Sequence, residues 1–326
     1  MSKKGLNHRW FVVVNIYAAS KKAGEKWEKA KKLIEDGGVD CEYMLTGADG
    51  SAGTLTMDGC RRGFRRFIAV GGDGTVHDVL NAIMSFVDAS AGAVPSSDFT
   101  LGVIPMGSGN DWIKTLGIRK NIREAVSVIT ACRTSRQDVV RVTCLDPQAL
   151  PEKKPLSVSY MVNVGGVGID ARVCQIVNHR KKKGERGKIL YVKALLKAIK
   201  ERKASRIIVF SDGRKVYEGD YLSIAFGVGK YSGGGMRQTP AAMIDDGLVD
   251  MTLIPDLPLG RIAREVPKLF TGNFLSVPEL VVTKSRSVEV FPVVAQGALV
   301  EVDGEVTGMS PVMVEVAGGW INVLVP

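Results

Sequence analysis

The stretch that decides the fold of this chain is Val70-Gly71-Gly72-Asp73-Gly74-Thr75. It lies between an apolar, strand-like segment at residues 67–70 and an amphipathic, helix-like segment at residues 76–86. A strand that turns through glycines into a helix leaves backbone N–H groups uncovered, and the positive end of the helix dipole favours phosphate there. Asp73 would repel phosphate unless a divalent cation lies between them. The stretch is therefore interpreted as a site for a nucleotide with Mg²⁺, and the alternative is a glycine turn with a solvated Asp.

The first 136 residues alternate strand-like and helix-like segments, a pattern typical of a parallel sheet covered on both faces. Ligands bind such sheets at the carboxyl ends of the strands. Polar or glycine-rich stretches follow four of the expected strands, at Asn15, Thr46, residues 71–75 and residues 107–111, so we expect them to meet at one edge. The expected strands are 9–16, 40–45, 67–70 and 100–104, and the expected helices are 21–36, 51–62, 76–86, 111–116 and 122–131.

From residue 137 onward the expected segments are mainly strands separated by turn signals such as Asp246-Gly247, Asp303-Gly304 and Gly318-Gly319. This pattern predicts a largely antiparallel β-domain. A chain of 326 residues has room for two domains, and we place the boundary between residues 136 and 137. The expected strands are 138–143, 156–164, 206–210, 222–228, 248–254, 279–283, 287–293, 298–302, 312–316 and 321–325, with helices at 169–180 and 189–203.

Composition narrows the class of protein. The chain is 45% hydrophobic and 24% charged, which is typical of soluble globular proteins, and it lacks an apolar run long enough to span a membrane. Its polar first residues favour a cytoplasmic location. Five widely spaced cysteines without a Cys-x-x-Cys pair argue against a disulfide framework and a zinc site. Three histidines leave the acid–base chemistry to carboxylates.

The formal net charge of +10 predicts an anionic partner. Part of this charge lies in residues 179–188, which precede a helix with apolar residues at helical spacing and lysines between them. Such a helix is compatible with lying on an anionic membrane surface. The alternative is an ordinary helix with a solvated basic face. A nucleic acid is not expected as a partner, and a homodimer stays open.

Four further motifs carry candidate chemistry. Like the first loop, the stretch Gly107-Ser108-Gly109-Asn110-Asp111 places small residues and an Asp before an expected helix. Asp111 is either a metal ligand or a helix N-cap. The cluster at residues 165–171 formally matches a dinucleotide pattern but lies outside a βαβ unit, so a tight strand-to-helix turn lining a cleft is favoured. Asp245-Asp246-Gly247 pairs two acids with main-chain carbonyls that suit Mg²⁺, and the alternative is a solvated turn. Asp303-Gly304-Glu305 can supply a general base for a hydroxyl, although most Asp-Gly-Glu turns do not.

In this order along the chain, these motifs resemble the bacterial diacylglycerol kinase and related lipid kinase family, which shares its catalytic module with sphingosine and ceramide kinases. The resemblance covers nearly the whole chain. It implies an α/β plus β architecture, with an N-terminal phosphofructokinase/NAD kinase-like α/β domain that binds ATP and a C-terminal antiparallel β-sandwich domain. It also implies an active site in the cleft between them.

The resemblance assigns roles position by position. Glu305 matches the proposed proton acceptor, and Asp303 is its neighbour in the same motif, so their roles are not separated. Residues matching acids that organise the catalytic Mg²⁺ are Asp73, Asp111 and Asp138, while Met243, Asp246 and Leu248 match a second, structural Mg²⁺ site, with main-chain oxygens from Met243 and Leu248. Residues matching nucleotide contacts are Asn15, Thr46, Gly71, Gly72, Asp73, Gly74, Thr75, Asp78, Gly107, Ser108 and Asn110.

The first loop departs from the family pattern Asn-Pro-x-Ala/Ser-Gly, because Ile16 and Ala19 stand in the proline and glycine positions. Asp78 and Ser108 replace the commoner Glu and Thr and keep their chemistry. The function expected is transfer of the ATP γ-phosphoryl group, with Mg²⁺, to a hydroxyl of diacylglycerol or a related lipid. The alternatives are an NAD kinase-like phosphotransferase with a soluble acceptor and a catalytically inactive lipid-binding relative.

Overall fold

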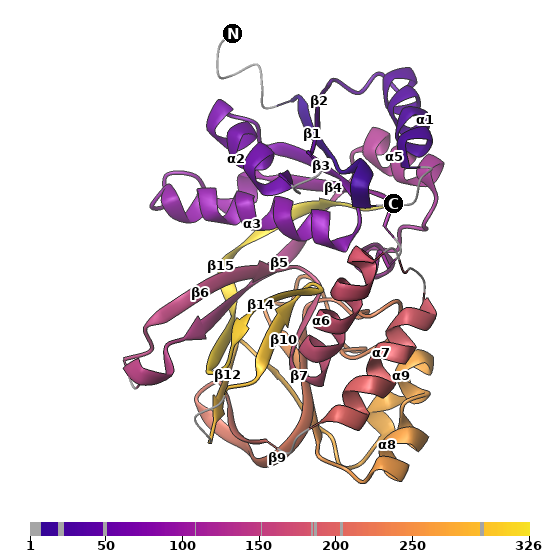
Figure 1. Cartoon of the computed structure of the whole chain (residues 1–326). Coiled ribbons are helices and arrows are strands. Elements are labelled where there is room, and N and C mark those ends of the chain that lie inside the picture. Colours follow the sequence, from indigo (N-terminus) through magenta and orange to yellow (C-terminus); the bar gives the residue numbers. More distant parts are fainter. Residues whose placement is uncertain are drawn as a thin grey trace. The chain divides into compact units, whose positions relative to one another are not determined.

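The computed structural model describes residues 8–18, 23–47, 51–107, 109–150, 152–183, 185, 188–202, 205–293 and 297–326. The chain divides into two compact units, which Figure 1 shows with their elements labelled. Unit 1 comprises Met1–Gln137 and Gly318–Pro326, and unit 2 comprises Asp138–Ala317. The strands β5 (Thr134–Leu145) and β15 (Val312–Leu324) each pass from one unit into the other.

Unit 1 contains a parallel sheet in the order β2, β1, β3, β4 and the end of β15. The strands β1, β3 and β4 are buried along almost their whole length and read as apolar runs, as strands of a parallel sheet do when helices cover both faces. This arrangement confirms the predicted α/β class of the unit. The strand bounds are β1 Trp10–Val14, β2 Cys41–Leu45, β3 Arg66–Gly71 and β4 Thr100–Pro105.

Helices pack on the two faces of this sheet. In α2, a Cβ on Gly59 would lie 3.1 Å from the Phe11 ring, so this helix packs on the Phe11 face. Val12, the next residue of β1, points to the other face, as does its partner Tyr43 in β2. Tyr43 packs edge-on against Trp27 of α1, so α1 covers that other face. The helices are α1 Ala23–Asp36, α2 Ala52–Arg62, α3 Asp73–Ala89, α4 Trp112–Thr115 and α5 Ile122–Ala131, with short 3₁₀ turns η2 Ile16–Ala18 and η3 Ser96–Asp98.

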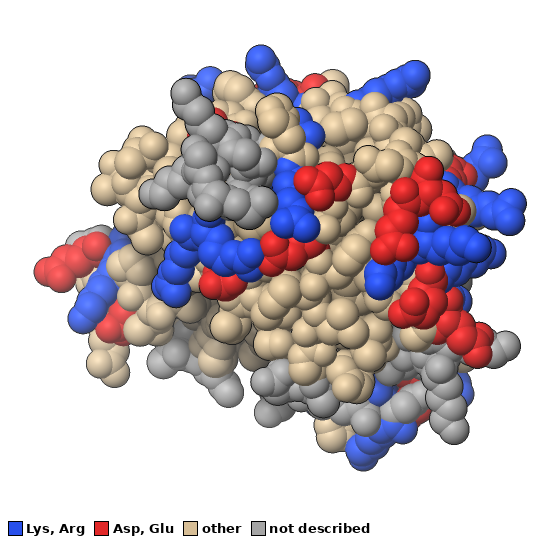
Figure 2. Space-filling model, turned by 90° about the horizontal axis from the view of Figure 1, so that it is seen from above, with Lys and Arg blue, Asp and Glu red and all other residues tan. Residues whose placement is uncertain are grey.

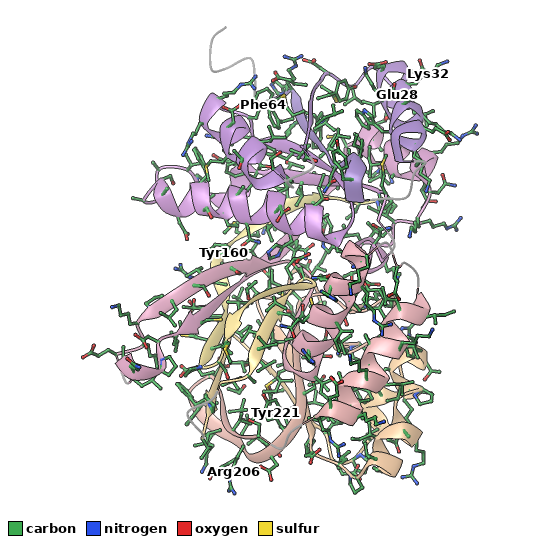
Figure 3. The ribbon with its side chains drawn as sticks, in the orientation of Figure 1. Glu28, Lys32, Phe64, Tyr160, Arg206 and Tyr221 are labelled. Carbon is green, nitrogen blue, oxygen red and sulfur yellow. The ribbon has the colours of Figure 1, made fainter. Side chains whose placement is uncertain are left out.

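The pattern of α1 illustrates why these segments are helical. Trp27, Ala30 and Ile34 recur every three to four residues and are buried against the sheet, whereas Glu28 and Lys32 are exposed on the outer side of the helix (Figure 3). Every element expected in the first 136 residues is present, with ends displaced by three residues or fewer. The largest displacement matters for the site, since α3 begins at Asp73 and this acid belongs to the first turn of the helix.

Unit 2 is built on antiparallel strands. The first half of β9 pairs with β8 and its second half pairs with β7 and β10, so this strand belongs to both sheets of a β-sandwich. One sheet continues from β8 to β12 and β15, and the other from β7 to β13 and β14. The bounds are β6 Pro155–Met161, β7 Val164–Gly168, β8 Arg206–Ser211, β9 Arg214–Gly227, β10 Val249–Pro255, β11 Val281–Ser285, β12 Ser287–Pro292, β13 Leu299–Val302 and β14 Glu305–Met309, with a 3₁₀ turn η4 at Pro147–Ala149.

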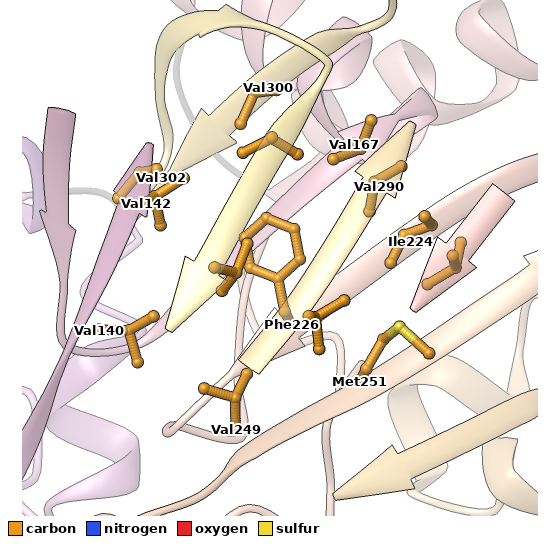
Figure 4. Packing of buried hydrophobic residues seen from close by; sticks show 14 of the residues in the cluster. Val140, Val142, Val167, Ile224, Phe226, Val249, Met251, Val290, Val300 and Val302 are labelled. Carbon is orange, nitrogen blue, oxygen red and sulfur yellow. The ribbon is translucent and has the colours of Figure 1, made fainter. Parts of the chain in front are cut away.

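Between the sheets lies a core of aliphatic side chains around Phe226 (Figure 4). Its members alternate with outward-facing residues along each strand, as in a sandwich. The residues labelled in Figure 4 are Val140, Val142, Val167, Ile224, Phe226, Val249, Met251, Val290, Val300 and Val302. A second apolar cluster joins α6 (Ile169–Lys182), α7 (Lys188–Glu201), α8 (Leu259–Glu265), α9 (Lys268–Thr271) and η5 (Phe274–Ser276).

Several expectations for this half need correction. The expected strand 156–164 is split into β6 and β7 between Met161 and Val164. The predicted turn at Gly318-Gly319 is wrong, because β15 continues through both glycines. A Cβ on Gly319 would lie 2.6 Å from Ser96 Oγ, so a glycine there permits close packing instead of a turn. The short elements β14, α8 and α9 were not expected.

The division into units also differs from the predicted boundary in the last nine residues, Gly318–Pro326. Asn322 and Val323 of β15 pair with Thr100 and Leu101 of β4, which adds a parallel strand to the sheet of unit 1. No local pattern reveals this pairing, because its partners lie more than 200 residues apart in the chain.

Candidate active site

The first glycine loop joins the end of β3 to the start of α3. Gly72 is the N-cap, and its carbonyl oxygen accepts from the N–H groups of Thr75 and Val76 at 3.0 and 3.2 Å. Thr75 Oγ1 accepts from Asn15 Nδ2 at 3.3 Å, which ties the end of β1 to the loop. A Cβ on Gly71 would lie 2.2 Å from Thr75 Oγ1, so only glycine fits there.

The second glycine loop, after β4, lies against the first. The N–H groups of Met106 and Gly107 both donate to the Gly71 carbonyl oxygen, at 2.7 and 3.1 Å. A Cβ on Gly107 would come within 2.5 Å of the Gly72 Cα atom. Asn110, in a left-handed conformation with φ 53°, closes the loop by donating from Nδ2 to the Gly107 carbonyl oxygen. The two loops are thus brought together, as expected from their place at the strand ends.

Asp73 of the first loop reaches across to the second. Its Oδ1 accepts from the N–H groups of Asp111 and Trp112 at 2.9 and 3.4 Å, so it caps the helix α4 from outside. The Asp111 side chain itself makes no capping hydrogen bond, and it forms an ion pair with Lys114 one turn later. The N-cap interpretation of the Asp111 carboxylate is therefore not what the structure shows.

The electrostatics of this acid pair suit a cation. Burial and the neighbouring charge of Asp111 raise the pKa of Asp73 to about 6. Within the described residues, no three acidic, histidine or cysteine side chains converge to hold a metal. Mg²⁺ commonly takes one or two carboxylates and completes its shell with phosphate oxygens and water, so Asp73 and Asp111 fit a Mg²⁺–nucleotide. Lys114 and Lys120 lie within electrostatic range of these acids, and the motif reasoning missed both.

The remaining nucleotide candidates lie at the same strand ends or in α3. Thr46 follows β2, and its buried Oγ1 atom has no hydrogen-bond partner in the part of the chain that the structure describes. Gly74 lies in the first turn of α3 and Asp78 in the second. Ser108 lies outside the described residues, as do Ala19 and Ser20 of the altered first loop. Burial lowers the pKa of His77 in α3 to about 4, so this histidine is neutral at pH 7.

In unit 2, Asp138 holds the turn that carries Asp246. Asp138 N donates to the Ile244 carbonyl oxygen at 2.6 Å, and its Oδ2 accepts from Gly247 N at 2.7 Å. Burial raises the pKa of Asp138 above its usual value. The carboxylate therefore has a structural role in this unit.

At the expected second metal site, Lys284 occupies the carboxylate of Asp246. Asp246 accepts from Leu248 N through Oδ1 at 3.2 Å and from Lys284 Nζ through Oδ2 at 2.7 Å. Lys284 also lies 3.4 Å from Asp250 Oδ2. Met243 is half exposed, with 53% of its surface accessible. A divalent cation at Asp246 would have to displace the Lys284 ammonium, so this donor set fits Mg²⁺ less well than the pair in unit 1.

The acid turn separates the roles of Asp303 and Glu305. Both carboxylate oxygens of Asp303 accept backbone N–H groups, from Val162 and Asn163 at 3.0 Å each. Val162 and Asn163 are the two residues between β6 and β7, and their N–H groups bind Asp303 instead of a neighbouring strand. Asp303 therefore has a structural role. Glu305 instead starts β14, is half-buried, and accepts from Asn178 Nδ2 of α6 at 3.2 Å. Asp303 therefore holds the backbone of the turn, whereas Glu305 is contacted by a side-chain amide.

Three residues that the motif reasoning missed hold this turn. The Gly304 carbonyl oxygen accepts from Cys174 Sγ at 2.7 Å and from Asn178 Nδ2 at 3.1 Å. Gly304 N donates to Glu301 Oε2 at 2.8 Å. Burial raises the pKa of Glu301 well above its usual value. Of these three residues, only Glu301 stands out in the sequence, because it is the one acid in the otherwise apolar strand β13.

An apolar pocket lies between α6, α7 and the helices α8 and α9 of unit 2. It contains about 580 Å³ of empty space, open solvent at its mouth included. Its wall is mainly aliphatic, and its polar lining residues are Glu265 and the hydrogen-bonded group of Asp170, Ser223 and Gln238. The Asp170 carboxylate there accepts from Ser223 Oγ and from Gln238 Nε2, and burial raises its pKa.

One face of α6 connects this pocket to the acid turn. Asp170, Cys174 and Asn178 recur every four residues and so lie on the same side of the helix. Asp170 lines the pocket, whereas Asn178 contacts Glu305. The expected strand-to-helix turn is found at Gly168, with φ 94°, and the next residues, Ile169 and Asp170, line the pocket.

Comparisons with known proteins agree with this architecture. A model of the diacylglycerol kinase catalytic domain matches residues 9–142. A model described as the YegS C-terminal NAD kinase beta sandwich-like domain matches residues 163–325, half of the chain. The chain belongs to the diacylglycerol kinase-like lipid kinase family.

Members of this lipid kinase family from several bacteria resemble the chain over most of its length. A "Probable lipid kinase YegS-like" protein of Xanthomonas axonopodis pv. citri is 27% identical over 268 residues, which are 82% of this chain and 81% of the relative. A protein of the same name from Stenotrophomonas maltophilia is 27% identical over 281 residues, 85% of this chain and 83% of the relative.

A solved structure shares the fold of this lipid kinase family member. It is that of a diacylglycerol kinase from Bacillus anthracis str. Sterne, with a TM-score of 0.73 and 21% sequence identity. The match covers 98% of this chain and 97% of the other. The likeness confirms the predicted fold class, an α/β domain followed by a β-sandwich domain. Of the helices described in the structure, none is both long and apolar enough to cross a bilayer.

Proposed function

We propose that this protein transfers the γ-phosphoryl group of ATP to a hydroxyl of diacylglycerol or a related lipid alcohol, with Mg²⁺. The observation that carries the proposal is the α6 face. It connects a pocket whose wall is mainly apolar, as hydrocarbon chains require, with a carboxylate, Glu305, suited to take a hydroxyl proton. A soluble acceptor such as NAD does not need an aliphatic pocket.

The nucleotide part of the proposal rests on the two glycine loops. The N–H groups at the N-terminus of α3 would bind the phosphates, and Asn15, Thr46 and Asn110 would complete the polar surroundings. Asp73 and Asp111 would hold Mg²⁺, and Asp138 is the third acid that the family resemblance assigns to it. The cation would neutralise charge that develops on the phosphates. Lys114 and Lys120 would supply further positive charge.

The acceptor part rests on unit 2. The pocket would hold the hydrocarbon chains, and Asn178 would orient the Glu305 carboxylate towards the acceptor hydroxyl. A bond forms between the hydroxyl oxygen and the γ-phosphorus, the bond from the γ-phosphorus to the bridging oxygen breaks, and ADP leaves. The hydroxyl proton passes to Glu305. Asp303 keeps the turn in shape.

The test is phosphorylation of a total bacterial lipid extract with γ-labelled ATP, followed by identification of the labelled product, with NAD offered in parallel. We expect a labelled phospholipid and no labelled NADP. The Asp73→Asn variant should lose the activity while keeping its circular dichroism spectrum. Label in NADP alone would support the soluble-acceptor alternative. ATP binding without any labelled lipid would support an inactive lipid-binding relative.

The acceptor also suggests where the protein acts. Diacylglycerol and similar lipids reside in bilayers, so an enzyme that phosphorylates them has to meet a membrane surface. We therefore propose that the protein makes peripheral contact with an anionic membrane from the cytoplasmic side.

A further inference from the structure

The helix α7 exposes large aliphatic side chains although its opposite side is already buried. Ile189, Val192 and Leu196 retain 72%, 41% and 57% of their accessible surface. Ala194 and Ala198 are buried on the other side, in the helical cluster of unit 2. The helix is therefore apolar on both sides, and an ordinary solvated face would not carry three such residues.

The exposed side of α7 is also cationic. Lys193, Lys197 and Lys200 are exposed and alternate with the aliphatic residues. The one acid in the α7 sequence is Glu201 at its end, which pairs with Lys197 at 3.6 Å and with Arg172 at 3.2 Å. On the face shown in Figure 2, which is largely uncharged, lysines and arginines gather in patches that also contain aspartates and glutamates.

A helix with this combination fits the boundary of an anionic bilayer. Its aliphatic side chains can enter the acyl region while long lysine side chains extend to the headgroups. Juxtaposed lysines are also attracted by anionic lipids. A protein partner would be expected to require a defined surface shape, whereas a row of alternating aliphatic and cationic residues requires none.

The position of α7 in unit 2 links this surface to the pocket. Leu195 and Ile199, on the buried side of α7, line the pocket together with Leu269 of α9 and Ile262 of α8. One helix therefore separates the apolar pocket from the exposed aliphatic and cationic side. Figure 1 shows α7 as an outer helix of this unit.

We propose that the exposed side of α7, formed by Ile189, Val192, Lys193, Leu196, Lys197 and Lys200, is the surface that docks on an anionic bilayer. This inference rests on the proposed function in one respect, namely that a lipid acceptor has to pass from the bilayer into the pocket behind α7. The aliphatic residues enter the bilayer boundary, the lysines bind anionic headgroups, and the acceptor enters past the same helix.

The experiment is co-sedimentation of the full chain, without ATP, with vesicles of phosphatidylcholine alone or mixed with phosphatidylglycerol. Wild-type protein should bind the mixed vesicles, and salt should weaken the binding. Lys193→Gln with Lys200→Gln should weaken it about fivefold per lysine. Ile189→Gln with Leu196→Gln should weaken it about tenfold or more, since these side chains lose their apolar burial.

The matched control is Leu156→Gln with Lys215→Gln, which removes an equally exposed aliphatic residue of β6 and an exposed lysine of β9. The control should bind like wild type. Equal loss in the control and the α7 variants, unchanged binding of both α7 variants, or equal binding of wild type to the two vesicle types would overturn the proposal. Melting temperatures verify that the variants are folded.

A second readout separates this inference from the proposed function. The α7 variants should phosphorylate a lipid acceptor dispersed in detergent at the wild-type rate and fail with the same acceptor in vesicles. If wild type phosphorylates no lipid in either form, the proposed function fails, while the vesicle binding data still decide whether α7 docks.

Discussion

At the scale of single residues, Asp73 is expected to cost stability at neutral pH. Its pKa is raised from 3.8 to about 6 in the folded protein, mainly by burial and by Asp111. The folded state therefore binds more protons than the unfolded state between about pH 4 and pH 6, and stability falls as the pH rises through this window. Above it, the ionised carboxylate costs on the order of 3 kcal/mol.

The Asp73→Asn variant should accordingly melt at a higher temperature than wild type at pH 8, while at pH 4 the two should be alike. The amide oxygen can still accept from the N–H groups of Asp111 and Trp112, so the contact between the loops is kept. Thermal melts at the two pH values, without Mg²⁺, measure the difference. A variant that is less stable than wild type at pH 8 would contradict the assigned charge repulsion.

Asn178 is expected to act as a positioning residue for Glu305. Asn178→Leu removes the amide that donates to the carboxylate and to the Gly304 carbonyl oxygen. Because that donor stabilises the ionised carboxylate, the acid limb of the pH–rate profile should move to higher pH. We expect kcat for lipid phosphorylation to fall about tenfold or more, with an unchanged KM for ATP.

The conservative variant Asn178→Gln should restore part of the rate, whereas a merely structural role would leave the pH profile in place. Gln175→Leu on the same helix is the control and should leave both the rate and the pH profile unchanged. Gln175 is exposed and contacts Arg172. An unchanged pH profile in Asn178→Leu would remove Asn178 from the mechanism.

Contacts that depend on local sequence were predictable, and those that depend on distant partners were not. Asp73 and Asp111 lie in the glycine loops that follow β3 and β4, and the loop pattern alone predicts that they lie close together. Asp303 and Glu305 could not be separated, since the difference is that Asp303 binds backbone N–H groups about 140 positions away. Asn178 lies in an amphipathic helix with no motif, so its contact with Glu305 is visible only in three dimensions.

At the scale of elements, the β10–β11 pair presents a lysine where the family resemblance expects a metal. Lys284 is paired with Asp250 across these strands and also binds Asp246. In an Asp73→Asn background, which removes a carboxylate of the proposed first cation site, Mg²⁺ should change the melting temperature little. Lys284→Met should melt at a lower temperature without Mg²⁺, because two carboxylates lose their cation, and should regain part of it when Mg²⁺ is added.

Lys215→Met, an exposed lysine paired with Glu218, is the control and should respond to Mg²⁺ like its parent. A large rise in melting temperature with Mg²⁺ in the parent itself would show that a metal displaces Lys284 and would restore Met243, Asp246 and Leu248 as a metal site.

Element boundaries were predictable where hydrophobic periodicity is strong, as in α5, whose expected and observed ends coincide. They were not predictable where a distant contact sets them. The gap between β6 and β7 depends on Asp303, and the continuity of β15 through Gly318 and Gly319 depends on packing against Ser96. The helices α8 and α9 span seven and four residues, which is too short for a helical period to be recognised.

At the scale of the whole molecule, the last residues of the chain complete the sheet of unit 1. Ile321, Val323 and Leu324 are buried, and a Cβ on Gly102 of β4 would lie 2.8 Å from Leu324. Deleting residues 318–326 should destabilise unit 1 by several kcal/mol, at about 1.5–3 kcal/mol for each large apolar side chain lost. Urea unfolding followed by Trp fluorescence and ATP binding measures the effect.

Deletion of Pro326 alone is the control and should leave both unfolding and ATP binding unchanged. If the longer deletion bound ATP with wild-type affinity and unfolded at the same urea concentration, the end of β15 would have no role in unit 1. The two-domain architecture was predictable from the change of pattern near residue 137, but the return of the chain was not. A five-residue apolar strand carries no signal for which sheet it joins.

This return of the C-terminus has a consequence for biosynthesis. A growing chain emerges from the ribosome N-terminus first, and domains commonly fold as they emerge. Here the sheet that carries the glycine loops lacks one strand until residues 318–326 have been translated. While the whole of unit 2 is being synthesised, the sheet formed by the first 137 residues is incomplete and the edge of β4 is uncovered. Ribosomes that stall or terminate early would release chains with an open sheet edge, which are prone to aggregate and are natural substrates for chaperones.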